Sequence, residues 1–289
     1  MRAEYFALLA AMSLGSATTF SGLALRTSTT LTTLVFSVIG TASVLWLITL
    51  FSQSLSTFAT WEIAPYVVAG IFVPFVARSF FIEGIRRLGP ARNSFLSSTQ
   101  PLIATTLAVV FLGESPTLPT ILGTCCIVGG VTLLSSRSKE QAKKMTWQPR
   151  DVFFPLFAGL LFASRDAVVR GAMFTLNNPY IAATTAATTS AIMLMTYLCV
   201  GRRWRDLVIS RPNFLFLLFS GLCAGFFYFF LFNALSVGSV VVVSPLTGSA
   251  PVFVLFFSIA FVSDHESITV RLILGGLIVM FGGSLITVF

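Results

Sequence analysis

Three charged residues lie inside long apolar runs, where an ionised side chain is costly. Arg78 sits in IFVPFVARSFFIEGI, and Arg165 and Asp166 are adjacent in LLFASRDAVV. On membrane-insertion scales, such a residue costs about 2.5–3.5 kcal/mol at the centre of a span, so it usually faces the protein interior or a water-filled cavity. We therefore interpret these residues as candidates for binding a charged group.

The counter-charges of these residues have two interpretations. Asp166 and Arg170 lie one helical turn apart, so they can form a pair with a purely structural role. Arg170 can also extend its guanidinium to the membrane surface. Arg78 and Arg165 have no such local partner. Either an anionic group of a substrate or a carboxylate from another helix, such as Asp166 or Glu83, could neutralise them.

Two polar, proline-containing stretches interrupt apolar runs in a similar way. SFLSSTQPLIATTLAVVFLGE covers residues 94–114, and SPLTGSAPVFVLFFSIAFVSDHE covers residues 244–266. A proline inside a helix removes a backbone hydrogen bond and bends the helix, and nearby hydroxyl and amide groups can serve the freed carbonyl or a ligand. For any single serine the alternative is close helix packing. The candidate binding residues of this kind, with two from the phenylalanine-rich run FFYFFLFN, are Ser97, Gln100, Pro101, Ser244, Ser249, Tyr228 and Asn233.

The composition indicates which elements must position these residues. Of the 289 residues, 56% are hydrophobic and 10% are charged, and the mean hydropathy is +0.92. A soluble domain has about a quarter charged residues, so we expect an integral membrane protein surrounded by the lipid bilayer. The net charge of +8 comes from basic residues scattered between apolar runs. This distribution is typical of cytoplasmic loops, and it does not form a stripe that would bind nucleic acid.

A helix needs about 20 apolar residues to cross the hydrocarbon core of a bilayer. Because backbone polar groups must be satisfied inside lipid, runs of this length form helices. We expect the first run to be a retained span and not a signal peptide. The ten expected spans are residues 4–25, 31–52, 63–84, 92–112, 118–135, 152–173, 180–200, 213–233, 238–262 and 269–288. The predicted fold class is therefore an all-α integral membrane protein.

The two halves of the chain resemble each other. Residues 1–135 and 152–289 each contain five expected spans, and a basic connecting segment, residues 136–151, separates them. Because five is odd, the halves enter the membrane in opposite directions, which predicts ten transmembrane helices as two inverted five-helix repeats. Such repeats are typical of secondary transporters with a site at the repeat interface. Residue types match at equivalent places in the halves: Leu96 and Leu246, Pro101 and Pro251, Gly123 and Gly275, and Gly130 and Gly282.

The basic residues gather in alternate connections. They follow the first, third, fifth, seventh and ninth spans, while the other connections have almost none. The positive-inside rule then places the basic loops in the cytoplasm and both termini outside. The basic residues concerned are Arg26, Arg86, Arg87, Arg92, Arg137, Lys139, Lys143, Lys144, Arg150, Arg202, Arg203, Arg205, Arg211 and Arg271.

Two longer stretches, residues 84–130 and 234–283, share a family pattern. Each has a small-residue turn, a mid-helix proline and a span with spaced glycines; the first also has a Gly-Glu helix end, where the second has Ser263-Asp264-His265 with Glu266 two places later. The pattern and the ten-span layout resemble the EamA-like branch of the drug/metabolite transporter superfamily. This resemblance implies a metabolite exporter or exchanger of the inner membrane, with substrates among amino acids, nucleobases, sugars or drugs.

Motifs of other protein classes are missing from the sequence. It has no nucleophile elbow, phosphate loop, HExxH or aspartate-rich metal motif, so we expect no enzyme activity, no cofactor and no metal. The four cysteines lie in apolar runs without metal-site spacing and are interpreted as packing residues. Glu114 and Glu266 end their spans, and we expect them to fix the turn into the next helix.

The sequence thus predicts a secondary transporter of a small-molecule substrate. The resemblance implies that the activity is export of amino acids or related small organic molecules. We expect transport by alternating access, around a cavity walled by spans 3, 4, 8 and 9 with help from 1 and 6. The alternatives are an uptake carrier, an exchanger or a non-transporting membrane scaffold. Asp166 is the candidate for a coupling proton. Two fused halves could form a complete unit as a monomer.

Overall fold

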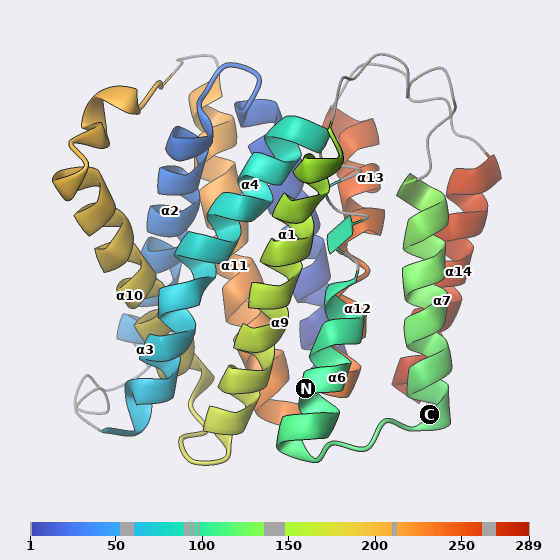
Figure 1. Ribbon diagram of the computed structural model, residues 1–289. Coiled ribbons are helices and arrows are strands. Elements are labelled where there is room, and N and C mark those ends of the chain that lie inside the picture. The colour runs from blue at the N-terminus through green and yellow to red at the C-terminus, as the bar shows by residue number, and fades with distance from the viewer. Residues whose placement is uncertain are drawn as a thin grey trace.

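The computed structural model describes residues 2–52, 61–89, 93, 96–97, 99–135, 148–209, 213–261 and 270–288. Within these residues the regular elements are helices that run along one common direction of a bundle (Figure 1). Seven of them are long and apolar enough to cross a membrane by length and composition, and three shorter apolar helices accompany them. Most of the predicted connecting segment, and the turn that holds Glu266, lie outside the described residues.

The helix limits follow the apolar runs closely. The first half contains α1 (Ala3–Ala24), α2 (Thr30–Ser52), η2 (Trp61–Ile63), α3 (Ala64–Gly70), η3 (Ile71–Val76), α4 (Ala77–Leu88), α6 (Gln100–Leu112) and α7 (Leu118–Ser135). The second half contains η4 (Pro149–Val152), α9 (Phe153–Met173), α10 (Pro179–Val200), η5 (Arg203–Asp206), α11 (Phe214–Val237), α12 (Val240–Thr247), α13 (Ala250–Phe261) and α14 (Val270–Val288). Many large apolar side chains are exposed on the outside of the bundle, as expected for helices that face lipid.

The third expected span is not a continuous helix. It is divided into α3, the π-helical segment η3 and α4, and Val73 in the middle has extended backbone angles (φ −143°, ψ 133°). The break leaves backbone groups without helical partners. Ser190 of α10 serves them, because its hydroxyl donates to the Gly70 carbonyl and accepts a hydrogen bond from the Phe75 N–H. A helix from the other half therefore stabilises the break.

The two matched prolines do not bend continuous helices, so that prediction is wrong. Pro101 lies in the first turn of α6, and Pro251 lies in the first turn of α13. Proline is tolerated there because the N–H groups of the first turn have no partner inside the helix. The ninth expected span is consequently two helices, α12 and α13, and the chain between them passes through Gly248.

The helices of the two halves are intermixed. α1 packs along α11, α12 and α13, whereas α9 packs along α3, α4 and α6. Hydroxyl pairs join the halves inside the bundle, with 2.7 Å between the Oγ atoms of Ser21 and Ser220 and 2.7 Å between the Oγ1 atoms of Thr49 and Thr184. Such interhelical hydrogen bonds help to hold membrane helices together.

α7 and α14 form an antiparallel pair at one side of the bundle (Figure 1). A Cβ atom added to Gly123 would lie 2.6 Å from the carbonyl oxygen of Gly282, and one added to Gly130 would lie 2.7 Å from that of Gly275. The backbones approach so closely that glycine is required at these contacts.

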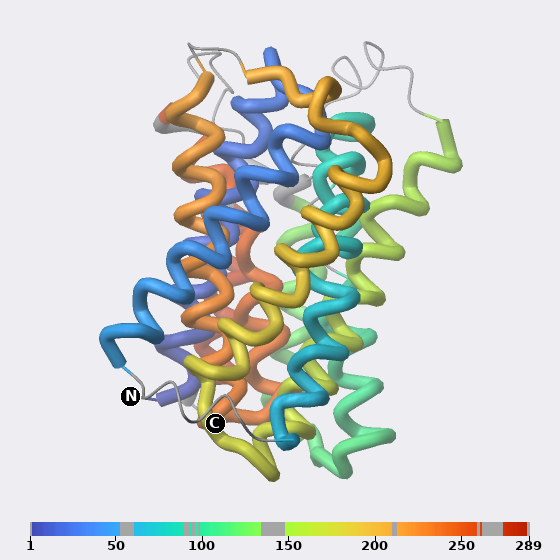
Figure 2. Tube along the Cα trace, turned by 90° about the vertical axis from the view of Figure 1, so that its left-hand side faces the viewer, coloured from blue at the N-terminus to red at the C-terminus, as the bar shows by residue number. Residues whose placement is uncertain are grey.

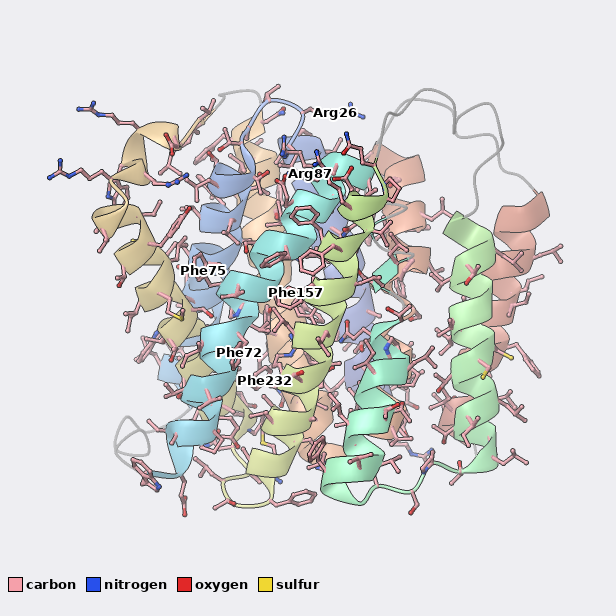
Figure 3. The ribbon with its side chains drawn as sticks, viewed as in Figure 1. Arg26, Phe72, Phe75, Arg87, Phe157 and Phe232 are labelled. Carbon is pink, nitrogen blue, oxygen red and sulfur yellow. The ribbon has the colours of Figure 1, made fainter. Side chains whose placement is uncertain are left out.

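The two ends of the bundle differ in charge. Both chain termini lie at the same end, as two perpendicular views agree (Figures 1 and 2). Arg26 and Arg87 lie at the opposite end (Figure 3). At this basic end, Glu83 pairs with Arg86 and Arg87 and accepts a hydrogen bond from Thr30.

Candidate functional site

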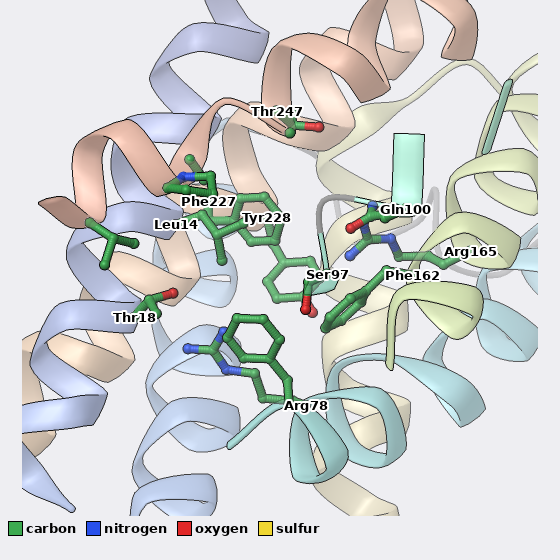
Figure 4. A pocket seen from close by; sticks show the side chains of 15 residues that line it. Leu14, Thr18, Arg78, Ser97, Gln100, Phe162, Arg165, Phe227, Tyr228 and Thr247 are labelled. Atoms are coloured by element: carbon green, nitrogen blue, oxygen red, sulfur yellow. The ribbon is translucent and has the colours of Figure 1, made fainter. Parts of the chain in front are cut away.

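A small cavity lies in the middle of the bundle, and α1, α4, α6, α9, α11, α13 and the residues between α12 and α13 enclose it. Both halves of the chain contribute to its wall. Figure 4 shows Arg78 and Arg165 reaching toward it from different helices, with aromatic rings between them. The lining residues are Leu14, Thr18, Arg78, Phe81, Ser97, Gln100, Phe162, Arg165, Phe227, Tyr228, Thr247, Gly248, Ala250, Pro251 and Val254.

The free space inside the cavity is limited. The volume open to the centres of water-sized molecules is about 50 Å³, whereas roughly 10–15 Å³ is needed for one water molecule. The cavity therefore holds a few waters, or part of a small organic molecule, in this conformation. A bulky ligand would require the surrounding helices to move apart.

Arg78 is a buried cation at the start of α4, directly after the break in the third span. Its side chain is 3% exposed, and its guanidinium carbon lies 5.4 Å from the centre of the Phe81 ring. Its Nε donates a hydrogen bond to the Ser37 hydroxyl at 3.2 Å, while its Nη2 has no hydrogen-bond partner. Within the described residues Arg78 makes no ion pair, so its charge is not neutralised there.

The second cation, Arg165, is paired with its sequence neighbour. Its Nη2 and Nε lie 2.6 Å and 2.9 Å from Oδ1 of Asp166, and Gln100 of α6 donates to Oδ2 of the same carboxylate at 3.1 Å. Both members of the pair are at most 2% exposed. Arg165 keeps one buried Nη1 without a partner. The Arg165–Asp166 ion pair of α9 is therefore linked to α6 through the side-chain amide of Gln100.

The interpretation that Asp166 pairs with Arg170 is wrong. Arg170 lies 3.6 Å from a carboxylate oxygen of Glu114 and donates a hydrogen bond to the Leu235 carbonyl at 3.0 Å. Glu83 is also not the partner of Arg78, because it pairs at the basic end of the bundle. The i,i+4 spacing did not decide the pairing, since the carboxylate of Asp166 turns toward Gln100 on a neighbouring helix.

Aromatic rings surround the guanidinium of Arg165. Its Cζ lies 5.4 Å from the ring centres of Phe162 and Tyr228 and 5.8 Å from that of Phe227. A guanidinium within about 6 Å of an aromatic face is attracted by the negative face of the ring. The rings thus hold the cation in place and give the cavity an apolar surface.

The ten residues predicted for the site divide into two groups. Five line the cavity: Arg78, Ser97, Gln100, Arg165 and Tyr228. The other five are not among its lining residues: Pro101, Asp166, Asn233, Ser244 and Ser249.

The residues of the second group have other surroundings. Asn233 donates to the Phe229 carbonyl of its own helix at 2.8 Å, and Ser249, between α12 and α13, donates to the Leu246 carbonyl of α12 at 2.6 Å. Ser244 is buried, and its hydroxyl has no hydrogen-bond partner in the part of the chain that the structure describes.

Pro101 touches the cavity wall from behind. A Cβ atom added to Gly248 would lie 2.6 Å from Cγ of Pro101. Part of the two polar, proline-containing stretches, which were predicted to offer groups to a ligand, is therefore a packing contact between the two halves.

Several lining residues were not singled out from the sequence. Phe81 lies three residues after Arg78, and Phe162 lies three residues before Arg165, so the helical period places each on the same face as its arginine. The helical period could therefore have identified Phe81 and Phe162 as candidate lining residues. Thr18 of α1 and Ser37 of α2, the partner of Arg78, carry no signal in the sequence because serine and threonine are frequent on these helices.

Glu114 connects the halves at the end of the bundle that holds the termini. Its carboxylate accepts hydrogen bonds from the N–H groups of Val240 and Val241, each at 3.1 Å, at the beginning of α12. A carboxylate at a helix N-terminus is favourable because the free N–H groups and the helix dipole are positive there. Glu114 therefore caps a helix of the second half, which differs from its predicted role in the turn to α7.

Among the described residues, no group of three or more histidine, cysteine or acidic side chains is arranged to hold a metal ion. The described cavity offers cationic, amide and hydroxyl groups surrounded by apolar rings. Such a site binds small molecules through a few placed polar groups.

The apolar helical bundle, with a cavity between its helices, is that of a multi-pass membrane protein. The sequence pattern of the EamA-like transporter family matches residues 1–136 and 151–288, and the chain belongs to this family. The resemblance inferred from the proline and glycine pattern is thereby confirmed. This family is one of transporters.

Two individual proteins resemble the chain, one in part of its sequence and one in its fold. An uncharacterized inner membrane transporter of Salmonella typhimurium, YicL, is 36% identical over 77 residues, which cover 27% of this chain and 25% of that protein. A protein of known crystal structure superimposes with a TM-score of 0.75 at 16% identity, covering 99% of this chain and 95% of the other. The second similarity shows that the fold of the whole chain occurs in an experimentally determined protein.

Proposed function

We propose that the protein is a secondary transporter that exports amino acids or related small organic molecules by alternating access. The observation that carries this proposal is the buried charge of Arg78 at a cavity that both halves enclose. A cation without a described counter-charge is unfavourable in a bundle that serves only as a scaffold. It is useful in a transporter, because a substrate can supply the missing acceptor.

The proposed architecture is ten transmembrane helices in two inverted repeats. If Gly123 matches Gly275 and Gly130 matches Gly282, a two-fold axis converts the contact of Gly123 with Gly282 into the contact of Gly275 with Gly130. Both contacts are present between α7 and α14. The reciprocal pattern supports the repeat, since a chance pairing of two helices has no reason to exchange equivalent residues.

The other helix contacts follow the same relation. The packing of α1 on α11 corresponds to that of α9 on α3 and α4, and the packing of α1 on α13 corresponds to that of α9 on α6. The family pattern matches two separate segments, one in each proposed half. These correspondences support domains at residues 1–135 and 152–289.

The proposed orientation places the basic end in the cytoplasm and both termini outside. Arg26 and Arg87 lie at one end of the bundle (Figure 3), and both termini lie at the other (Figure 1). Basic residues favour the cytoplasmic side of a membrane. The inner membrane of a bacterium is the proposed location, in keeping with the Salmonella relative.

Alternating access requires contacts that close one end and can be released. Glu114 joins α6 to the beginning of α12 and lies close to Arg170 of α9. We propose that these contacts close the outer end in this conformation, while the basic end opens during the cycle.

Coupling to a proton is proposed to involve Asp166. Among the described carboxylates, it contacts two lining side chains of the cavity, Arg165 and Gln100. Protonation of Asp166 would weaken its bond to Arg165 and leave that guanidinium free for substrate.

The transport proposal is tested with purified protein in proteoliposomes. The vesicles are loaded with labelled amino acids, nucleobases, sugars or organic acids, and release is compared with that from protein-free vesicles at several pH gradients. We expect the protein to accelerate release of at least one compound class. If the folded protein accelerates none, the scaffold interpretation replaces transport.

A further inference from the structure

Three buried polar atoms of lining residues have no hydrogen-bond partner among the described residues. They are Nη2 of Arg78, Nη1 of Arg165 and the hydroxyl of Ser97. A guanidinium donates hydrogen bonds and accepts none, whereas a hydroxyl can do both. Unpaired buried donors destabilise the protein, so the complementary ligand presents acceptor atoms to them.

The charge of the cavity lining also favours a ligand that presents acceptor atoms. The described lining contains two arginines and no carboxylate. Asp166 lies behind the lining, and its two oxygens are engaged by Arg165 and Gln100. The sequence between Leu88 and Gln100, part of which the structure does not describe, contains no acidic residue. Among the described groups at the cavity, the charges of Arg165 and Asp166 offset each other, and the positive charge of Arg78 remains.

Two backbone carbonyls near the break between α12 and α13 are already hydrogen-bonded. The Ser244 carbonyl, in the last turn of α12, accepts from the Gly248 N–H and the Thr247 hydroxyl, both at 2.9 Å. The Leu246 carbonyl accepts from the N–H and hydroxyl of Ser249. These two carbonyls are therefore less available to an ammonium group of a ligand.

Aromatic rings at the cavity already lie close to the two guanidinium groups. An ammonium group can lie over a ring in place of a carboxylate, but Phe81 already faces Arg78, and three rings face Arg165. A further cation there would be repelled by both guanidinium groups. The rings remain suitable for the uncharged body of a ligand.

From these observations we infer that the cavity selects small organic acids whose carboxylate has no accompanying ammonium group. Arg78 binds the carboxylate, the free N–H of Arg165 and the Ser97 hydroxyl complete its hydrogen bonds, and the aromatic rings contact the hydrocarbon body. This inference rests on the proposed transport function and narrows its substrate class, since it favours simple carboxylates over zwitterionic amino acids.

The test compares ligands that share one skeleton and differ in charge. The affinities of 3-phenylpropanoate, phenylalanine and 3-phenylpropan-1-ol for the detergent-purified full chain are measured by calorimetry and by thermal shift. We expect 3-phenylpropanoate to bind about tenfold or more tightly than phenylalanine, since the two guanidinium groups repel the ammonium group and the described lining has no carboxylate to pair with it. The alcohol should bind more weakly than the carboxylate by a similar factor.

Variants locate the binding to Arg78. Arg78→Gln should lose about tenfold or more in affinity for 3-phenylpropanoate, whereas Arg78→Lys, which keeps the charge, should retain part of it. Arg205→Gln, an exposed arginine at the basic end, is the matched control and should bind like the wild type. Size-exclusion chromatography confirms that each variant is folded.

Three results would overturn this inference. They are binding of phenylalanine at least as tight as that of 3-phenylpropanoate, an unchanged affinity in folded Arg78→Gln, and no binding of the carboxylate by folded wild-type protein. None of these decides whether the protein transports, because the proteoliposome panel tests release independently. If amino acids are released there, the transport proposal stands and the carboxylate selection fails.

Discussion

The Nε of Arg78 donates a hydrogen bond to the hydroxyl of Ser37, 3.2 Å away on α2, and this is the one hydrogen bond found for the guanidinium among the described residues. Ser37 itself is 1% exposed and lies outside the cavity lining. It therefore positions the cation from behind and leaves the other guanidinium nitrogens for the cavity.

Ser37→Ala should weaken ligand binding without removing the charge. Loss of the hydrogen bond frees the guanidinium to change its direction, so we expect the affinity for 3-phenylpropanoate to fall several-fold and the stability to fall by about 1 kcal/mol. Calorimetry and thermal unfolding provide the measurements. Ser284→Ala, an exposed serine of α14, should change neither, and an unchanged affinity in Ser37→Ala would refute the positioning role.

Asp166→Asn should be strongly destabilising. It leaves Arg165 buried without its counter-charge, which costs about 3–5 kcal/mol when one partner of a buried ion pair is removed. The double variant Arg165→Gln with Asp166→Asn should recover much of the loss, because neither charge remains. Thermal unfolding in detergent measures both. Equal stability of Asp166→Asn and the wild type would show that the pair is not formed.

Glu114→Gln should destabilise the end of the bundle that holds the termini. The variant removes the negative charge at the beginning of α12 and beside Arg170, with an expected loss of about 0.5–2 kcal/mol. Glu62→Gln removes an exposed acidic side chain and serves as the control in the same thermal unfolding experiment. If the two variants unfold at the same temperature, Glu114 does not hold the halves together.

Gly248→Ala should disturb the contact between the halves at the cavity. The added Cβ would lie 2.6 Å from Cγ of Pro101, and such overpacking costs about 1–3 kcal/mol. Gly129→Ala is the control, because a Cβ at that position on α7 meets open space. Unfolding temperatures of the two variants give the comparison, and a harmless Gly248→Ala would mean that the contact is loose.

The sequence predicted the helices well where one apolar run makes one helix. The expected span 118–135 coincides with α7, and most other limits of the described helices differ by one or two residues, since apolar length is the physical requirement for crossing lipid. The breaks were harder to predict. Val73 leaves the helical conformation inside the third span, and Ser190, far away in the sequence, supplies the compensating hydrogen bonds.

The candidate site was predicted in part for a similar reason. Arg78 and Arg165 were found because a charge inside an apolar run is conspicuous, and both line the cavity. The pairing of Asp166 with Arg165 was only one of two alternatives, because helical spacing also allows Arg170, while the direction of the carboxylate depends on Gln100 from another helix. Tertiary packing, which decides such directions, has no local signature in the chain.

The central claim is that Arg78 binds the transported molecule, and release from proteoliposomes tests it most directly. Vesicles containing wild type, Arg78→Gln or the control Arg205→Gln are loaded with the compound that the wild type releases fastest. The account predicts that release in Arg78→Gln falls to the rate of protein-free vesicles, while Arg205→Gln matches the wild type. Wild-type release by folded Arg78→Gln would contradict it.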